Sequence, residues 1–108
     1  MAIDTVTMRN ALVDAYKAQA THFSLHSADA TSGNELAVTR QAANWGATSA
    51  SAATASPAAF TITSGMTVGG AGAWSALSGG TFLDGAALTS QTFASNGTYT
   101  VTATYTQS

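Results

Sequence analysis

The stretch GTYTVTATYT, residues 97–106, decides the fold class of this chain. Apolar or aromatic residues at the odd positions from Tyr99 to Tyr105 alternate strictly with threonines at the even positions. Successive side chains of a β-strand point to opposite faces, so this period of two predicts a strand with one inward and one outward face. We expect Tyr99, Val101 and Tyr105 to face the core.

A turn signal stands at the start of this strand. Asn96-Gly97 favours a tight hairpin because both residue types tolerate positive φ. It separates the last strand from an apolar stretch at Gln91–Phe93, so the sequence predicts a hairpin between them. Asn96-Gly97-Thr98 also matches the N-glycosylation triplet, but the hairpin explains the same residues.

Short alternating stretches bounded by turn residues predict further strands upstream. We interpret Gly69–Gly72 as turn material, and Ser78-Gly79-Gly80 as the turn of a hairpin. The region from Ala47 to Ala59, nearly all Ala, Ser and Thr with the single proline Pro57, indicates a loop or irregular edge segment. The expected strands lie at Thr21–His26, at Glu35–Thr39 with a continuation toward Trp45, at Phe60–Thr63, from Met66 to Val68, at Ala73–Leu77 and at Thr81–Asp84.

The N-terminal region has a different period. Met8, Leu12, Ala15 and Tyr16 recur with helical spacing, Val13 widens this stripe, and Asn10, Asp14 and Lys17 stand opposite. Asp4 or Thr5 can cap the first turn, and Ile3 precedes them as a candidate staple residue. The sequence predicts an amphipathic helix over about residues 5–20, whose apolar stripe needs a sheet or a neighbouring molecule.

The predicted elements define one architecture. At 108 residues the chain fits a single domain. Short strands separated by glycine turns, with no crossover helix after Ala20, favour an antiparallel sheet over a parallel one. We expect a mainly β protein, an antiparallel β-sandwich of jelly-roll or immunoglobulin-like type over about residues 21–107, with one N-terminal α-helix.

Composition restricts the classes of partner. Only 7% of residues are charged, against about a quarter in an ordinary globular protein, and the net charge is −2. Arg9, Lys17 and Arg40 are far apart in sequence, so we expect neither nucleic acid nor a membrane as a partner. A weakly charged surface favours association with other proteins, although GC-rich coding or a secreted β-protein would leave the same composition.

Two features that the sequence lacks bear on the compartment in which the chain is made. The chain has no cysteine, which excludes disulfides and thiolate metal sites. Met1–Asp4 lacks the basic region of a signal peptide, and no apolar run approaches the ~20 residues of a membrane span. We therefore expect a product that is made in soluble form in the cytoplasm of its producer.

Metal and acid–base chemistry have few candidate residues. His22 and His26, with Asp29 nearby, resemble a metal site, but on a strand their side chains stand about 13 Å apart. A helix at this place would suit a metal; on the predicted strand we expect a polar outer face. Glu35 and Asp84 are the carboxylates left for a glycosidase-like pair, which we rank low. We expect no catalytic, cofactor or metal site.

Nucleophilic and carbohydrate-binding sites are weakly indicated as well. Ser75 lacks the flanking glycines of a nucleophile elbow, and Gly69–Gly72 lacks the residues of a phosphate loop. The aromatic residues could form a carbohydrate platform, but in a domain of this size they favour a core. Trp45 and Tyr105 are the aromatics that we expect to be most exposed.

Several segments of the chain together resemble a known pattern: Met8–Leu12, Phe23–Asp29, Glu35-Leu36, Arg40–Ala42, Trp74–Leu83, Gln91–Phe93 and Thr98–Thr106. In these segments the chain resembles a family of short virion structural proteins of tailed actinobacterial phages, usually labelled tail-fibre, minor tail or decoration proteins. The resemblance implies a virion part and no catalytic residues. Val68–Ala73 departs from the family's usual strand at this place.

From these observations we expect a non-enzymatic phage structural protein, located in the virion and assembled in the host cytoplasm. The leading interpretation is a capsid decoration or minor capsid protein that stabilises the shell; the alternatives are a tail-fibre or minor tail protein and, below them, a carbohydrate-binding module. Expected partners are the major capsid protein or other virion proteins, and further copies in a homo-oligomer. Candidate interface residues are Met8, Leu12, Tyr16, Trp45 and Tyr105.

Overall fold

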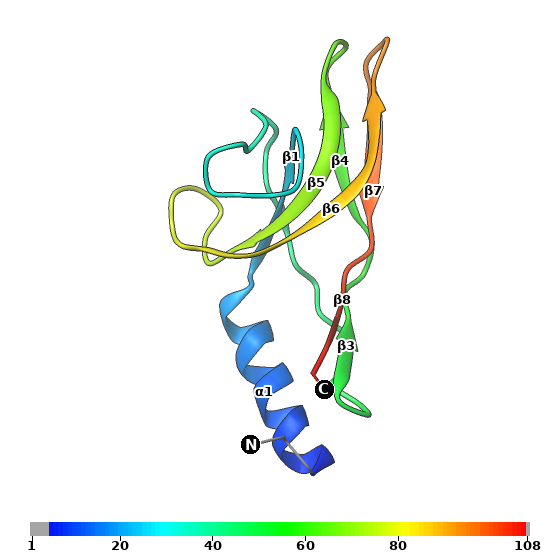
Figure 1. The fold of residues 1–108 in the computed structure, drawn as a ribbon. Coiled ribbons are helices and arrows are strands. Elements are labelled where there is room, and N and C mark those ends of the chain that lie inside the picture. The colour runs from blue at the N-terminus through cyan, green and yellow to red at the C-terminus, as the bar shows by residue number, and fades with distance from the viewer. Residues whose placement is uncertain (1–4, 108) are drawn as a thin grey trace.

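The computed structural model describes residues 5–107, which form one N-terminal helix followed by antiparallel strands (Figure 1). The expectation of a mainly β, sandwich-like fold with one helix is confirmed. The elements are α1 (Val6–Gln19), β1 (His22–His26), β2 (Gln41–Ala42), β3 (Ala52–Thr54), β4 (Ala58–Ile62), β5 (Thr67–Trp74), β6 (Phe82–Thr92), β7 (Gly97–Val101) and β8 (Thr104–Thr106).

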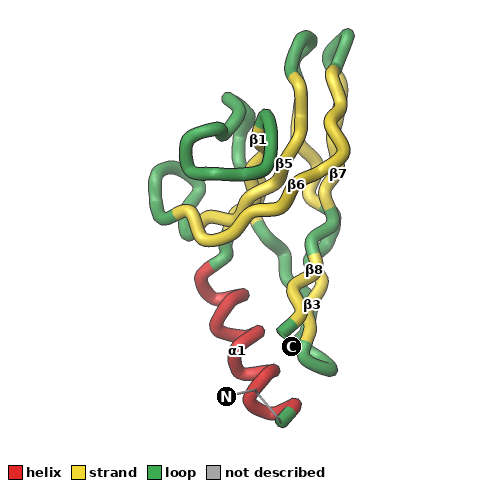
Figure 2. The backbone as a smooth tube through the Cα atoms, in the orientation of Figure 1, coloured by secondary structure: helices red, strands yellow, loops and turns green. Residues whose placement is uncertain are grey.

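The strands form one larger sheet and two pairs. The sheet has the order β2-β1-β5-β6, and the pairs are β4 with β7 and β3 with β8, all antiparallel. The β4–β7 pair lies beside the β5–β6 hairpin, while α1 and the β3–β8 pair extend away from them (Figures 1 and 2). The molecule is therefore elongated, about 47 × 22 × 22 Å.

The apolar core lies between the large sheet and β4. Phe23 and Leu25 of β1 pack with Phe60 and Ile62 of β4, and Val68 of β5 joins them. All five side chains are buried. Burial of side chains of this size supplies most of the stabilisation of a small domain, roughly 1.5 to 3 kcal/mol for each of them.

The helix forms where it was expected, but its predicted apolar stripe is covered only in part. Thr5 caps it, its hydroxyl accepting the Met8 N–H at 3.3 Å, whereas Asp4 and the staple residue Ile3 lie outside the described residues. Val13 is fully buried, while Met8 and Leu12 of the predicted stripe are exposed. Asn10 and Lys17, predicted to face solvent, instead bond the 46–51 segment. The inner side of the helix therefore combines apolar packing through Val13 with hydrogen bonds from Asn10 and Lys17.

Asn10 and Lys17 hold a turn that the sequence did not reveal. Ala50 and Ser51 have φ of 51° and 68° between the paired residues Ser49 and Ala52. Asn10 Oδ1 accepts the Ser51 N–H at 2.8 Å, and Lys17 Nζ donates to Gly46 O at 2.9 Å. These bonds fasten α1 to the β3 end of the molecule.

The predicted loop from Ala47 to Ala59 is partly wrong. It contains β3 and the start of β4, and its alanines Ala53, Ala55 and Ala58 are buried. Small side chains let β3 pair with β8 close to the core. In the sequence, these alanines look the same as those of a low-complexity loop, because alanine carries little strand propensity of its own.

The expected short strand at Glu35–Thr39 is also wrong. Of these residues only Glu35 forms a bridge, with His26, and the strand in this region is β2, farther along. Leu36 and Val38, which suggested the strand, pack part-buried against the core.

The interpretation of Gly69–Gly72 as a turn is wrong, because these residues lie inside β5. A Cβ on Gly70 would stand 2.1 Å from the Ala28 carbonyl oxygen, and one on Gly85 of β6 would stand 2.7 Å from Ala30 Cβ. The glycines thus let the 27–34 loop approach the backbone of the sheet closely, which is the other common reason for glycine in a strand.

The last strand keeps its predicted faces but is interrupted. Tyr99, Val101, Ala103 and Tyr105 are part-buried and the even-numbered threonines are exposed, as the alternation predicts. The strand is split into β7 and β8, which pair with β4 and β3 respectively.

The predicted Asn96-Gly97 hairpin is wrong, because β7 pairs with β4 while β6 pairs with β5. Asn96 Oδ1 instead accepts the Ser64 N–H at 2.9 Å and joins two neighbouring turns.

Candidate functional site

Exposed apolar side chains on α1 form the main candidate site. Met8 and Leu12, one turn apart on the same face of the helix, are 55% and 38% exposed, large values for apolar side chains. Of the other exposed large apolar residues within residues 5–107, Val6 lies nearly opposite Met8 around the helix and Leu77 lies between β5 and β6. The α1 surface continues into a hollow of about 280 Å³ between the helix, β6 and β8. The hollow is lined by Leu12, Ala15, Tyr16, Gln19, Leu83, Tyr105 and Gln107.

Tyr16 connects this helix surface to the strands. Its ring stacks on Tyr105 with centroids 3.8 Å apart and planes 9° from parallel, and it meets the edge of Trp45 at 5.7 Å. Its hydroxyl donates to Asp84 Oδ2 at 3.0 Å. Burial, followed by this bond to the Asp84 carboxylate, raises the pKa of Tyr16. Tyr16 therefore stays protonated as a donor at neutral pH.

The five candidate interface residues have two different roles in the structure. Met8 and Leu12 are exposed. Trp45, part-buried, donates its indole N–H to the Ala20 carbonyl at 2.8 Å and makes an edge contact with Phe23. Tyr16, Trp45 and Tyr105 form an aromatic cluster, and Leu12 lines a hollow with its two tyrosines.

A second hollow, of about 240 Å³, opens where the two layers diverge. Its walls come from β5, β6 and the break between β7 and β8, and about half of the lining residues are alanine or glycine. Tyr16, Phe23 and Asp84 line it as well.

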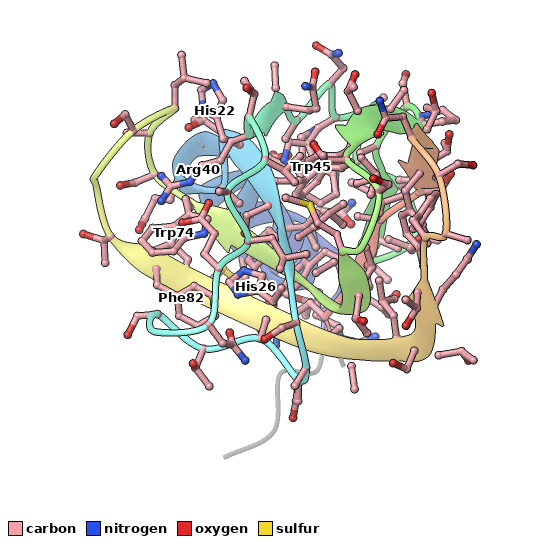
Figure 3. All side chains as sticks on the ribbon, turned by 90° about the horizontal axis from the view of Figure 1, so that it is seen from above. His22, His26, Arg40, Trp45, Trp74 and Phe82 are labelled. Atoms are coloured by element: carbon pink, nitrogen blue, oxygen red, sulfur yellow. The ribbon has the colours of Figure 1, made fainter. Side chains whose placement is uncertain are left out.

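A buried polar network lies on the opposite face of β1 and was not predicted. Ser24 and His26, expected on a polar outer face, are both fully buried. Ser24 Oγ lies 2.6 Å from His26 Nε2, and His26 Nδ1 lies 2.7 Å from Asn34 Oδ1. The Trp74 indole N–H donates to Ser24 Oγ at 2.8 Å. Figure 3 shows His26, Trp74 and Phe82 together on this side.

The partners of Asn34 fix the direction of the bonds. Its Oδ1 accepts the Thr31 N–H and its Nδ2 donates to the Asp29 carbonyl, both at 2.8 Å, so the oxygen faces His26. His26 Nδ1 therefore carries a proton, and a neutral ring leaves Nε2 to accept from the Ser24 hydroxyl. Every member of this chain of four side chains has a partner.

The order serine, histidine, asparagine matches the connectivity of a nucleophile, its base and an orienting amide. Here, however, the Ser24 oxygen already accepts the Trp74 N–H, and neither Ser24 nor His26 lines either hollow. A substrate has no route to Ser24 Oγ in this arrangement. The network instead holds the 27–34 loop onto the sheet.

Arg40 is the second unpredicted anchor. It forms a two-bond ion pair with Glu35 at 2.8 Å and donates to the carbonyls of Ala76 and Gly79. Its guanidinium lies 3.8 Å from the ring centroid of Trp74. The Arg40 hydrogen bonds lower the pKa of Glu35. Arg40 thus joins the loop after β5 to Glu35, which lies between β1 and β2. In the sequence, the one sign of this role was the isolation of Arg40 as a charged residue among apolar ones.

The residues considered for metal or acid–base chemistry are engaged elsewhere. No cluster of three histidine or carboxylate side chains suited to a metal occurs in residues 5–107. His22 bonds the Thr21 hydroxyl, at the other end of β1 from His26. Glu35 is paired with Arg40 and Asp84 accepts from Tyr16, so these two carboxylates have separate structural partners.

Comparison with family models, curated proteins and solved structures found no match to this chain. Within residues 5–107, α1 is too short and too polar to cross a membrane.

Proposed function

We propose that this chain is a non-enzymatic structural protein of a phage particle, a capsid decoration or minor capsid protein that stabilises the shell. One observation carries the proposal: α1 presents Met8 and Leu12 to solvent while its buried face is satisfied by its own chain. Exposed apolar side chains beside a hollow are typical of a surface that another protein covers.

The geometry supports a rigid docking surface in particular. Tyr16 and Tyr105 stack in the wall of the hollow that Leu12 also lines, and Asn10 and Lys17 fasten the helix to the 46–51 segment. A preorganised surface loses little conformational freedom on binding, which suits a protein that occupies many equivalent sites. The low charge and the resemblance to short phage virion proteins support the same assignment.

Tail-fibre or minor tail function is the competing role, and the number of copies per particle separates the two. Quantitative mass spectrometry of purified particles should find hundreds of copies, on the scale of the major capsid protein. A few copies per particle would overturn the decoration role in favour of the tail. Absence from particles would overturn both.

Substitution on the helix tests the docking surface itself. Leu12→Lys should abolish incorporation into particles, because it places a charge in the apolar contact. Ala18→Lys is the matched control, since Ala18 is also exposed on α1 but lies away from the hollow. Equal incorporation of the two variants would contradict the proposed surface.

A carbohydrate platform is less well supported. Trp45 is anchored to the Ala20 carbonyl, and Trp74 is buried beneath Arg40. Arg40 covers the ring of Trp74, and Trp45 is part-buried in contact with Tyr16 and Phe23, so neither indole stands out from the surface as a stacking platform for sugar rings does.

A further inference from the structure

Strand β6 ends the larger sheet with an open edge. It is the longest strand of the described chain, 11 residues, and its one strand partner is β5. The strands that follow it pair elsewhere, β7 with β4 and β8 with β3. The outer backbone groups of β6 therefore meet no strand within residues 5–107, whereas the opposite end of the sheet is blunted by β2, which has two residues.

The middle of β6 is exposed to solvent along this open edge. Asp84, Gly85, Ala86 and Ala87 are all exposed. One face of Gly85 is closed by Ala30, because a Cβ there would stand 2.7 Å from Ala30 Cβ. Glycine has no side chain, so the surface that Gly85 shows to solvent is backbone. An open backbone edge of this kind is a template for another strand.

Edge strands are usually protected from pairing with other chains by charged residues, proline or bulges, and β6 has few of these features. Phe82–Thr92 contains one charged residue, Asp84, and neither lysine nor proline. Register shifts opposite Val68/Gly70 and opposite Ala73/Trp74 interrupt the pairing of β6 near Thr89 and near Leu83, and between them Asp84–Ala87 keep a regular ladder with β5. The unprotected part is therefore the segment around Ala86.

We propose that two copies of this chain pair through β6, antiparallel about a two-fold axis at Ala86. In this register Gly85 lies opposite Ala87 and Asp84 lies opposite Leu88, so no like charges meet and small side chains flank the axis. The two sheets then join into one continuous sheet whose ends are both β2. The interface is closed, because within residues 5–107 the joined larger sheet ends on both sides at the two-residue strand β2.

A second copy fits this edge better than a charged peptide does. The segment from Gly85 to Thr92 carries no charge, and the carboxylate of Asp84 already accepts from Tyr16. The partner strand must therefore be nearly uncharged, which β6 itself is. This pairing is independent of the proposed virion role and of the α1 surface.

Cross-linking tests the register directly, because the chain has no native cysteine. Ala86→Cys should give a covalent dimer on mild oxidation, since the two copies of residue 86 face each other. Thr89→Cys is the control within β6. Its two copies would lie roughly 20 Å apart in the antiparallel register and should remain uncross-linked.

A charge at the axis tests the same interface without oxidation. Analytical ultracentrifugation at micromolar concentration should find a dimer for the native chain and a monomer for Ala86→Lys, with circular dichroism confirming that both are folded. Thr61→Lys, an exposed threonine of β4, should leave the dimer intact. A monomeric native chain would overturn the proposal. So would a dimer that survives Ala86→Lys but is lost in Leu12→Lys, which would place the contact on α1.

Discussion

Strands β1 and β6 both pair with β5 but have opposite surroundings. Four of the five residues of β1 are buried, because the core covers one face and the 27–34 loop covers the other. None of the eleven residues of β6 is buried. The same sheet therefore has an inner strand that holds the fold together and an edge strand that is free to bind. Substitutions of the same kind in the two strands should differ accordingly.

The largest difference is expected for leucine. Leu25 of β1 is 1% exposed, so Leu25→Ala should lower the free energy of unfolding by about 2 to 5 kcal/mol through lost burial and the cavity left behind. Leu88 of β6 is part-buried, and Leu88→Ala should cost less than about 1.5 kcal/mol. Urea unfolding followed by tryptophan fluorescence measures both. Equal losses would mean that β6 is covered as completely as β1.

Glycine in β5 should be the next most sensitive position. Gly70→Ala places a Cβ against the Ala28 backbone, which cannot move aside as a flexible side chain would. We expect a loss of about 3 kcal/mol from the displaced loop. Gly33→Ala, whose Cβ would meet nothing closer than 3.9 Å, is the control and should stay within about 1 kcal/mol of the native chain. A neutral Gly70→Ala would show that the loop does not press on β5.

The buried network gives a smaller effect. Ser24→Ala removes the acceptor of the Trp74 N–H and the donor to His26, leaving two buried polar atoms without partners. The cost should be about 2 kcal/mol. Ser90→Ala on β6 should change stability by less than about 0.5 kcal/mol, because Ser90 is exposed. Thermal unfolding by calorimetry compares the two serines.

The smallest effect concerns acid pH. The pKa of Glu35 is lowered in the folded state from an ordinary value near 4.5, so its contribution to stability is present above that value. It is lost as the pH falls through the folded pKa, when the carboxylate is protonated and its bonds to Arg40 weaken. Denaturant midpoints measured from pH 6 downward should fall less steeply for Glu35→Gln than for the native chain. Parallel curves would contradict this role of Glu35.

The sequence by itself determined the local elements. The helical period and the Thr5 cap placed α1, and the alternation at residues 97–106 placed the part-buried and exposed faces of β7 and β8. Both signals are local, because they depend on side-chain spacing along a single segment. The same locality explains why the class of fold, mainly β with one helix, could be predicted.

Tertiary structure decided which surfaces are covered. Alternation assigned His26 to an outer face, but the 27–34 loop closes over that face, and the glycines that admit the loop lie more than 40 residues farther along the chain. The sequence showed that the apolar stripe of α1 needs a sheet or a neighbouring molecule, but only the structure shows that Met8 and Leu12 stay exposed while Asn10 of the same helix bonds a turn at residues 49–52. The pairing of β7 with β4, and not with the neighbouring β6, likewise depends on residues far apart in the sequence. A period in the sequence distinguishes two faces of an element, but only the packing of distant segments determines which face meets water.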